Sequence, residues 1–348
     1  MLLVAISLRA QAPNLLTPPA KLSSSAPKLA SLCDDSLGRS FATKNAWLKY
    51  HARLLYQWHL VIGQFPEHKA PLKVEIVTTE TFSDFVRRYV RYQIEDGVMT
   101  DAYLLTPTHI RGKLPAIVVF HQTIATNAKQ AAGVDASNPE LMQGMQLVRR
   151  GYIVLCPRCF LFNNRASFAD DFASAAGNAL LMKERHPDWT GMARMTWDAV
   201  RAVDFLESLP NVDPARIGGI GHSLGAKEVL YAAAFDQRYK AVVFSEGGIG
   251  LSFSNWDAVW YLGPQIHQPG FALDNDQVLA LIAPRAFLLL AGDYADGDKS
   301  WPYIESVLPI YKLFNEETNI GWFNHHAGHR YPSAAQETAE AFLDVHLK

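Results

Sequence analysis

A serine flanked by two glycines, in the stretch Gly221-His222-Ser223-Leu224-Gly225, has a setting suited to covalent chemistry. An apolar run that ends in glycine precedes it, and helix-forming residues follow it. Glycines two positions before and after the serine remove side chains that would clash in a tight strand-to-helix turn. This is the context that a G-x-S-x-G nucleophile elbow requires. We therefore expect Ser223 to act as a nucleophile.

A serine hydroxyl is a weak nucleophile until a base takes its proton, and a carboxylate usually orients that base. On a strand-turn-helix elbow, the acid and then the histidine should follow the serine along the chain. His329 lies in a Gly-His turn between the last expected strand (319–323) and the closing helix, so we expect it to be the base. His325 and His326 are competitors. The group HHxxH has the spacing of an H-E-x-x-H zinc site, but Gly328 and the place after a strand do not give the helical face that such a site needs, so we expect no metal.

The acid has several candidates, because three aspartates follow the expected strand 286–292: Asp293, Asp296 and Asp298. Asp293 directly follows the strand, where its side chain can point into the sheet layer, and Asp298 lies further out. Asp296 lies four residues past the strand, which is near the usual reach, so it is favoured. Glu246 is the alternative acid, because it ends the preceding strand and could reach the same histidine.

Charge that develops on an ester oxygen needs preorganised donors, here expected to be two backbone N–H groups. One belongs to Leu224, directly after the nucleophile, and the other to Gln122, in the loop after the expected strand 115–120. His121 is interpreted as a cap on that strand. Lys227, one helical turn after the serine, is interpreted as a solvated lysine, with binding of a substrate hydroxyl or carboxylate as the alternative.

Strands and helices that alternate along the chain must position these groups. Strands are expected at 115–120, 152–156, 216–221, 241–245, 286–292 and 319–323, and helices at 139–150, 192–209, after the elbow and at 333–347. Such alternation predicts an α/β fold with a mostly parallel central sheet covered by helices on both faces. A helix at 44–63 and a hairpin at 86–94 and 102–107 form an N-terminal extension.

The chain divides into a poorly ordered lead-in (1–43) and a catalytic domain (44–348), which includes an N-terminal helix and strands (44–112). The first residues resemble the apolar run and small-residue cleavage site of a secretory signal, although a basic start is missing. This favours a secreted or periplasmic protein over a cytoplasmic one. An aromatic segment (248–284) is expected to be a lid-like insertion. Its aromatic side chains would either hold a sugar or acyl group or pack the lid onto the body.

Composition excludes several classes. The 348 residues carry a net charge of −2 and show no basic cluster, so no nucleic-acid partner is expected. No stretch is long enough to cross a bilayer, and no membrane partner is expected. The chain has three cysteines, an odd number that disfavours a disulfide framework. Cys156 and Cys159 have the spacing of redox or zinc sites, but no second pair follows, so they are interpreted as packed side chains.

The sequence resembles the dienelactone hydrolase and acetyl xylan esterase-like group of the α/β-hydrolase superfamily over roughly residues 85–348. The segments that carry the resemblance are 120–123, 151–165, 195–225, 295–304 and 328–332. It implies the α/β-hydrolase fold and a metal-independent serine hydrolase with Ser223, an acid near Asp296, and His329. Where this group usually has an aspartate and a glycine-rich turn, this chain has Arg158 followed by aromatic residues, which weakens inference about the substrate.

A second likeness is to the glucuronoyl esterases, a carbohydrate-esterase family. It rests on Ser223, on Lys227 one helical turn later and on Glu246 after the next strand. Those enzymes carry an arginine directly after the serine, where this chain has Leu224.

These features predict a serine esterase that cleaves carboxylic esters through an acyl-enzyme and needs no cofactor. Its substrate would be a small-molecule or carbohydrate ester, including acyl or uronoyl esters of sugars. A serine peptidase of the same fold is one alternative, although no propeller or large cap domain is evident. A catalytically silent binding protein is another, although the complete set of serine, acid and histidine argues against it.

Overall fold

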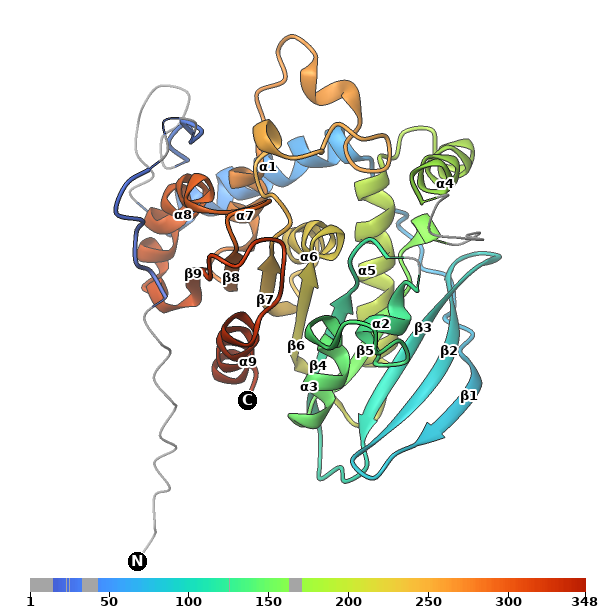
Figure 1. The fold of residues 1–348 in the computed structure, drawn as a ribbon. Coiled ribbons are helices and arrows are strands. Elements are labelled where there is room, and N and C mark those ends of the chain that lie inside the picture. Colours follow the sequence, from blue (N-terminus) through green and yellow to red (C-terminus); the bar gives the residue numbers. More distant parts are fainter. Residues whose placement is uncertain (1–14, 23, 25, 33–42, 125, 163–170) are drawn as a thin grey trace, which may run out of the picture.

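The structure is a computed structural model that describes residues 15–22, 24, 26–32, 43–124, 126–162 and 171–348 (Figure 1). Its centre is a nine-stranded sheet in the order β1-β2-β3-β5-β4-β6-β7-β8-β9. The strands are β1 (Glu75–Thr81), β2 (Phe85–Glu95), β3 (Val98–Pro107), β4 (Leu114–Phe120), β5 (Ile153–Pro157), β6 (Val212–His222), β7 (Tyr239–Ser245), β8 (Ala286–Ala291) and β9 (Ile320–Asn324).

Neighbouring strands in the run β5-β4-β6-β7-β8-β9 pair in parallel. The pairs β1–β2, β2–β3 and β3–β5 are antiparallel. The expected mostly parallel α/β sheet with an N-terminal β-extension is therefore confirmed. The parallel strands are apolar because helices cover both faces of them. Along β4, Ala116 and Val118 face one hydrophobic core, and Ile117 and Val119 face the other.

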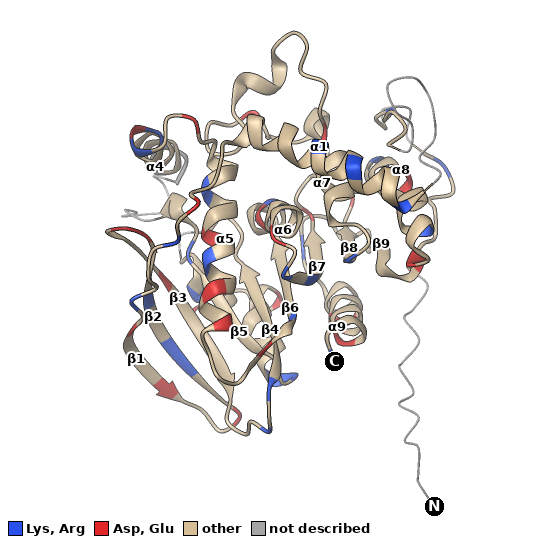
Figure 2. Ribbon diagram, turned by 180° about the vertical axis from the view of Figure 1, so that it is seen from behind, with Lys and Arg blue, Asp and Glu red and all other residues tan. Residues whose placement is uncertain are grey.

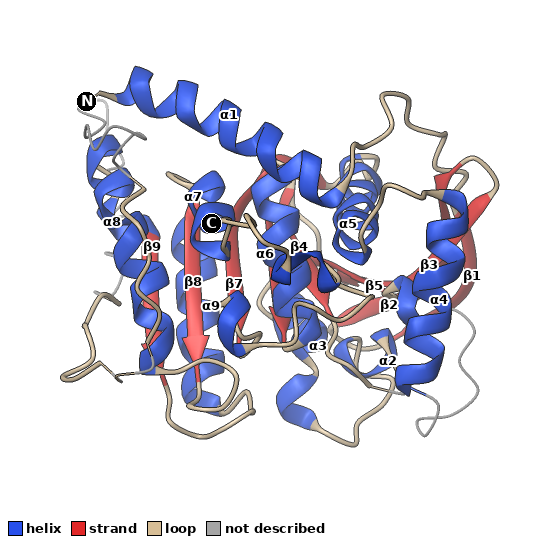
Figure 3. Cartoon of the chain, turned by 90° about the horizontal axis from the view of Figure 1, so that it is seen from above, coloured by secondary structure: helices blue, strands red, loops and turns tan. Residues whose placement is uncertain are grey.

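Helices lie on both sides of the sheet (Figure 3). One core contains residues of α1 (Lys44–Ile62), α5 (Gly191–Glu207), α6 (Leu224–Phe235), α7 (Asn275–Ile282) and α8 (Trp301–Phe314), with α4 (Asp171–Arg185) beside α5. The other contains residues of α2 (Ala128–Ala131), α3 (Gln143–Arg149) and α9 (Ser333–Leu347). Seen from behind, acidic and basic residues are interspersed over these elements (Figure 2).

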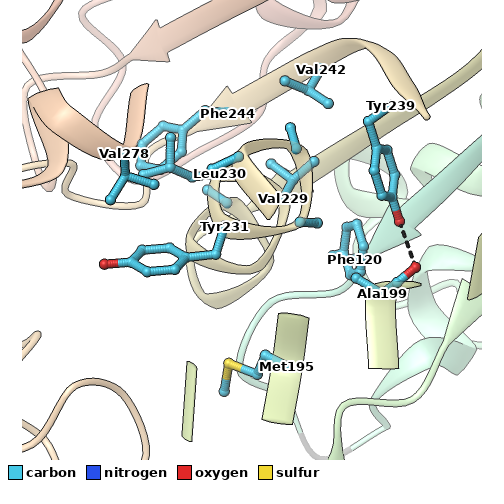
Figure 4. Close-up of a cluster of buried hydrophobic side chains, with 14 of the residues drawn as sticks. Phe120, Met195, Ala199, Val229, Leu230, Tyr231, Tyr239, Val242, Phe244 and Val278 are labelled. Atoms are coloured by element: carbon cyan, nitrogen blue, oxygen red, sulfur yellow. Dashed lines mark hydrogen bonds between the residues drawn. The ribbon is translucent and has the colours of Figure 1, made fainter. Parts of the chain in front are cut away.

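The helix that carries the elbow, α6, is buried in the larger core. Val229 and Leu230 pack near Val242 and Phe244 of β7 (Figure 4). The hydroxyl of Tyr239 donates a hydrogen bond of 3.0 Å to the carbonyl oxygen of Ala199 in α5 (Figure 4). These contacts tie α5, α6 and β7 together, so the start of α6 has a fixed position.

The structure adds elements that the sequence pattern did not predict: β1, α2, α4, α7 and α8. Every residue of β1 is exposed, so this strand lacks the apolar alternation used to detect strands. The segment 248–284 is not an irregular loop throughout, because α7 occupies its last part. None of the described helices is long and apolar enough to span a bilayer.

Part of the lead-in contacts the domain. Leu16 forms a parallel bridge with Trp322 at the exposed edge of β9, and the N–H of Trp322 donates to Leu15 O over 2.8 Å. Leu32 is buried in the larger core. The apolar run interpreted as a remnant signal falls within residues 1–14, outside the described residues.

Candidate active site

Ser223 occupies the corner between β6 and α6, with φ of +57° and ψ of −117°. Its N–H donates to Ser245 O at the end of β7 over 2.8 Å. A Cβ at Gly221 would lie 2.0 Å from Gly225 O, and a Cβ at Gly225 would lie 2.0 Å from Phe120 O. Because both clashes involve backbone, side chains at these positions cannot simply rotate away. The two glycines thus allow the turn that exposes the serine.

His329 follows β9 and faces the serine. Its Nε2 lies 2.9 Å from Ser223 Oγ, although the two residues are 106 positions apart. The preceding Gly328 has φ of +76°, and its N–H donates to Gly292 O over 2.6 Å, so this turn is fixed to the end of β8. In Figure 1, the connection from β9 to α9 runs past the ends of β8 and β7. The imidazole remains partly exposed, which leaves its edge open to a substrate.

Glu246 is the acid that contacts this histidine. Its Oε2 lies 3.2 Å from His329 Nδ1, and its side chain is fully buried. The carboxylate also accepts hydrogen bonds from the N–H groups of Gly292 (2.5 Å) and Ala295 (2.8 Å). Such a carboxylate fixes the tautomer with the proton on Nδ1, which leaves Nε2 free to accept the serine proton. Glu246 itself has φ of +49°, a left-handed conformation directly after β7.

Asp296, the acid favoured from the sequence, does not contact His329, and this expectation is corrected. Its buried carboxylate accepts hydrogen bonds from the N–H groups of Gly248 (2.6 Å) and Ile249 (2.9 Å) and from the Ser300 hydroxyl (2.8 Å). Burial raises the pKa of this carboxyl. The side chain points toward the segment after Glu246 and supports it, while its own backbone N–H faces the Glu246 carboxylate.

The remaining acids and histidines of this region pair elsewhere. Asp293 contacts His326 Nδ1 over 2.6 Å, and Asp298 accepts from the Asn324 side-chain amide over 3.2 Å. His325 Nδ1 accepts the Ala327 N–H instead. Over the described residues, no three His, Cys, Asp or Glu side chains are grouped in a way that could hold a metal ion.

Sequence reasoning overlooked His222, which packs beneath the histidine of the site. The His222 and His329 rings are 4.8 Å apart between centroids, and His222 Nδ1 lies 3.0 Å from Ser245 Oγ. Burial, together with the neighbouring histidines His329 and His325, lowers the pKa of His222 to about 3. A neutral ring here adds no positive charge next to the imidazole that must accept a proton. The only sequence signal was its place directly before the serine.

The two expected oxyanion donors lie where the elbow meets the end of β4. Leu224 is the first residue of α6, and a Cβ on Gly225 would lie 3.0 Å from His121 O, so the His121–Gln122 backbone passes close to the elbow. His121 Nδ1 donates to Gln122 O over 2.7 Å, and its Nε2 accepts the Cys159 N–H over 3.1 Å. His121 thus holds the loop that carries Gln122.

Comparison with known proteins finds hydrolases and esterases of similar sequence or fold. Residues 100–255 match the model of the dienelactone hydrolase family. Over 248 residues, the chain is 25% identical to the Bacillus subtilis (strain 168) protein YtaP, which is described as a hydrolase; the match covers 67% of this chain and 77% of YtaP. The sheet order, the elbow and these matches point to the same fold. The chain has the α/β-hydrolase fold.

Solved structures of esterases share this hydrolase's fold. A glucuronoyl esterase from Solibacter usitatus superposes with a TM-score of 0.74 and 17% identity, covering 95% of this chain and all of that one. A Bacteroides fragilis protein described as an acetyl xylan esterase superposes with a TM-score of 0.65 and 16% identity, covering 82% of this chain and 77% of that one. Together with the family match, these neighbours support a carboxylic-ester hydrolase.

In this α/β-hydrolase Lys227 is buried, which corrects the interpretation of a solvated lysine. It is 3% exposed, and its Nζ donates to Ser254 Oγ over 2.7 Å. The ammonium lies 4.0 Å from the centroid of the Trp256 ring and 4.8 Å from that of Tyr261, both in the 248–284 segment. Burial lowers the pKa of Lys227 to about 7. Trp256 and Tyr261 are themselves buried, so these aromatics pack the segment onto α6.

Two cysteines of the described residues lie in the protein interior. Cys156 and Cys159 are buried and unpaired by disulfide, and burial raises the pKa of both thiols. Cys159 lies in the loop after β5, where its N–H donates to His121 Nε2 and its thiol lies against the buried Glu228. Burial raises the pKa of Glu228 to about 8, so this side chain is mainly a neutral acid at pH 7.

Proposed function

We propose that this α/β-hydrolase is a serine esterase that cleaves carboxylic esters through an acyl-enzyme, with Ser223 as nucleophile, His329 as base and Glu246 as acid. The observation that carries the proposal is the continuous chain of contacts from Ser223 Oγ to His329 Nε2 (2.9 Å) and from His329 Nδ1 to Glu246 Oε2 (3.2 Å). A nucleophile, its base and the group that orients the base are the three parts that acyl transfer requires.

In the first half-reaction, Ser223 Oγ attacks the ester carbonyl carbon while its proton passes to His329 Nε2. The N–H groups of Leu224 and Gln122 receive the negative charge on the carbonyl oxygen. When the tetrahedral intermediate collapses, the C–O bond to the alcohol breaks and His329 gives its proton to the departing oxygen. Glu246 remains ionised and stabilises the imidazolium that forms between these two transfers.

In the second half-reaction, water attacks the acyl-enzyme, and His329 takes a proton from that water. The C–O bond to Ser223 then breaks, the serine regains its proton from His329, and the carboxylic acid is released. The same residues therefore serve both steps, and no further reactant is needed.

We further propose that the substrate is an ester of a carbohydrate, either an acyl ester or a uronoyl ester. Two structural neighbours, a glucuronoyl esterase and a protein described as an acetyl xylan esterase, support this class. Glu246 as the acid and Lys227 on the elbow helix add to the likeness with glucuronoyl esterases. Leu224, in place of arginine, marks a difference directly beside the oxyanion.

The test is a panel of p-nitrophenyl esters, acetylated xylooligosaccharides, alkyl esters of glucuronic acid and short peptides, assayed with the wild-type enzyme and with Ser223→Ala. The proposal expects turnover of at least one sugar ester, and a loss on the order of a million-fold in the variant. Cleavage of peptides but no esters would favour a peptidase instead. Absence of both activities in folded protein would favour a silent binding protein.

A further inference from the structure

Tyr294 is a large aromatic side chain exposed beside the reacting histidine. It is 69% exposed, the most of any large apolar side chain for which the structure gives a value. Its ring centroid nevertheless lies 5.1 Å from that of His329, with the two planes inclined by 45°. An exposed aromatic ring forgoes most of the stabilisation that its burial would contribute. Tyr294 therefore gives little to the core, while it contacts the histidine of the site.

The backbone that carries Tyr294 is held by the Glu246 carboxylate and by a backbone hydrogen bond within its own turn. The next residue, Ala295, donates its N–H to Glu246 Oε2 over 2.8 Å, and the N–H of Asp293 donates to Asp296 O over 2.8 Å. Lys299 Nζ donates to Tyr294 O over 3.1 Å. The exposed ring thus stands on a fixed turn.

Lys299 also connects this turn to the 248–284 segment. Its ammonium lies 4.8 Å from the centroid of the Phe253 ring, which itself packs edge-on against Tyr303 at 5.9 Å. Phe253 and Lys299 therefore restrain the Tyr294 turn from the side of the insertion. A ligand can therefore bind to the Tyr294 ring without first ordering this backbone, and the entropic cost of binding is lower.

The chemistry of the proposed reaction says which part of a substrate comes near this ring. His329 must give a proton to the alcohol oxygen, so that oxygen lies within about 2.6–3.2 Å of Nε2 during catalysis. A ring attached next to that oxygen then lies beside the imidazole. Stacked or tilted ring pairs have centroids about 4.5–7 Å apart. From its position against His329, the Tyr294 ring can approach the ring of the alcohol to such a distance.

We infer that Tyr294 forms the alcohol subsite of this esterase and selects esters whose alcohol carries a ring with an apolar face. This deepens the proposed function and rests on it. A sugar and an aryl alcohol share that chemistry, so both are tested. Tyr294 is assigned the binding of the alcohol, and Lys299 the positioning of the turn.

Partitioning of the acyl-enzyme isolates this subsite, because water and added alcohols then compete for one common intermediate. The p-nitrophenyl ester that the wild-type enzyme hydrolyses fastest is supplied with benzyl alcohol, with methyl β-D-xylopyranoside or with ethanol. The ratio of transferred ester to free acid is measured for wild type, Tyr294→Ala and Tyr294→Phe. Tyr56→Ala is the matched control, since Tyr56 is 60% exposed on α1.

Tyr294→Ala should lower the transfer ratio for ring alcohols about two- to tenfold, the range that one aromatic contact gives. The ratio for ethanol should not change, and Tyr294→Phe and Tyr56→Ala should match the wild type. A decrease for only one ring alcohol identifies which source the subsite prefers. An unchanged ratio with both ring alcohols, or an equal decrease with ethanol, would overturn the inference while leaving the esterase intact. A wild-type enzyme that hydrolyses no ester would instead refute the proposed function, and with it the subsite.

Discussion

The backbone N–H of Asp296 donates to the carboxylate of Glu246 over 3.2 Å, so the two acids belong to one support around His329. Glu246 contacts the imidazole, whereas Asp296 binds the backbone of residues 248 and 249. Both side chains are fully buried. In the proposed mechanism Glu246 therefore orients the base, and Asp296 positions the chain that follows Glu246.

Glu246→Gln should lower kcat by about ten-thousandfold with the fold intact, because an amide cannot stabilise the imidazolium or fix its tautomer. Asp296→Asn should have a smaller effect on kcat and a larger effect on stability, because an amide cannot accept all three hydrogen bonds that the carboxylate accepts. Steady-state kinetics and urea unfolding of both variants separate the two effects. If stably folded Asp296→Asn lost more kcat than Glu246→Gln, Asp296 and not Glu246 would be the acid of the triad.

Gly225→Ala tests the close approach at the elbow. The added methyl would lie 2.0 Å from Phe120 O, a backbone atom that cannot rotate away. We expect destabilisation by about 3 kcal/mol or more, at the upper end of overpacking effects. Gly177→Ala is the control, because no atom lies within 4 Å of its added methyl in α4 and alanine favours a helix by about 1 kcal/mol. Equal stability of both variants would show that the elbow is looser than this packing indicates.

Lys227→Met tests whether the ammonium is buried, through the pH dependence of the free energy of unfolding. The lysine has a pKa of about 7 in the folded chain, and an ordinary lysine has one of about 10.4 in the unfolded chain. Between these values the unfolded state binds more protons, so the wild-type free energy of unfolding rises with pH relative to the variant. The rise should amount to a few kcal/mol in total. Urea unfolding from pH 6 to pH 10 measures it, with Lys49→Met on the exposed side of α1 as control.

A pH-independent difference between Lys227→Met and the wild type would show that the ammonium is solvated in solution. It would also show that the contacts to Ser254 and Trp256 do not persist. Lys49→Met should give no such trend in either case.

The sequence was sufficient to predict the parallel part of the sheet, because buried strands such as β4 and β8 are short apolar runs. It was not sufficient for β1, whose residues are all exposed. Edge strands of this kind are formed through pairing with a neighbour, here β2, and leave no apolar pattern. The sequence also did not predict α7, which lies in the long aromatic segment 248–284 and packs against the body of the protein.

For the site, residue types and order were enough to place Ser223 and His329 on neighbouring turns, but they could not choose between Glu246 and Asp296. That choice depends on the left-handed backbone at Glu246, with φ of +49°, and on the direction in which each carboxylate points. Burial of Lys227 also depends on distant residues, because Ser254 and Trp256 fold over α6 from the insertion. Neither feature has a local pattern in the sequence.

The central claim is that Ser223 forms the covalent intermediate, and mass spectrometry of the labelled protein tests it most directly. The wild type is treated with a fluorophosphonate, digested, and the modified peptide is sequenced. The account predicts one adduct on Ser223, no adduct in Ser223→Ala, and strongly slowed labelling in Glu246→Gln. Labelling at another residue, or undiminished labelling of folded Ser223→Ala, would contradict it.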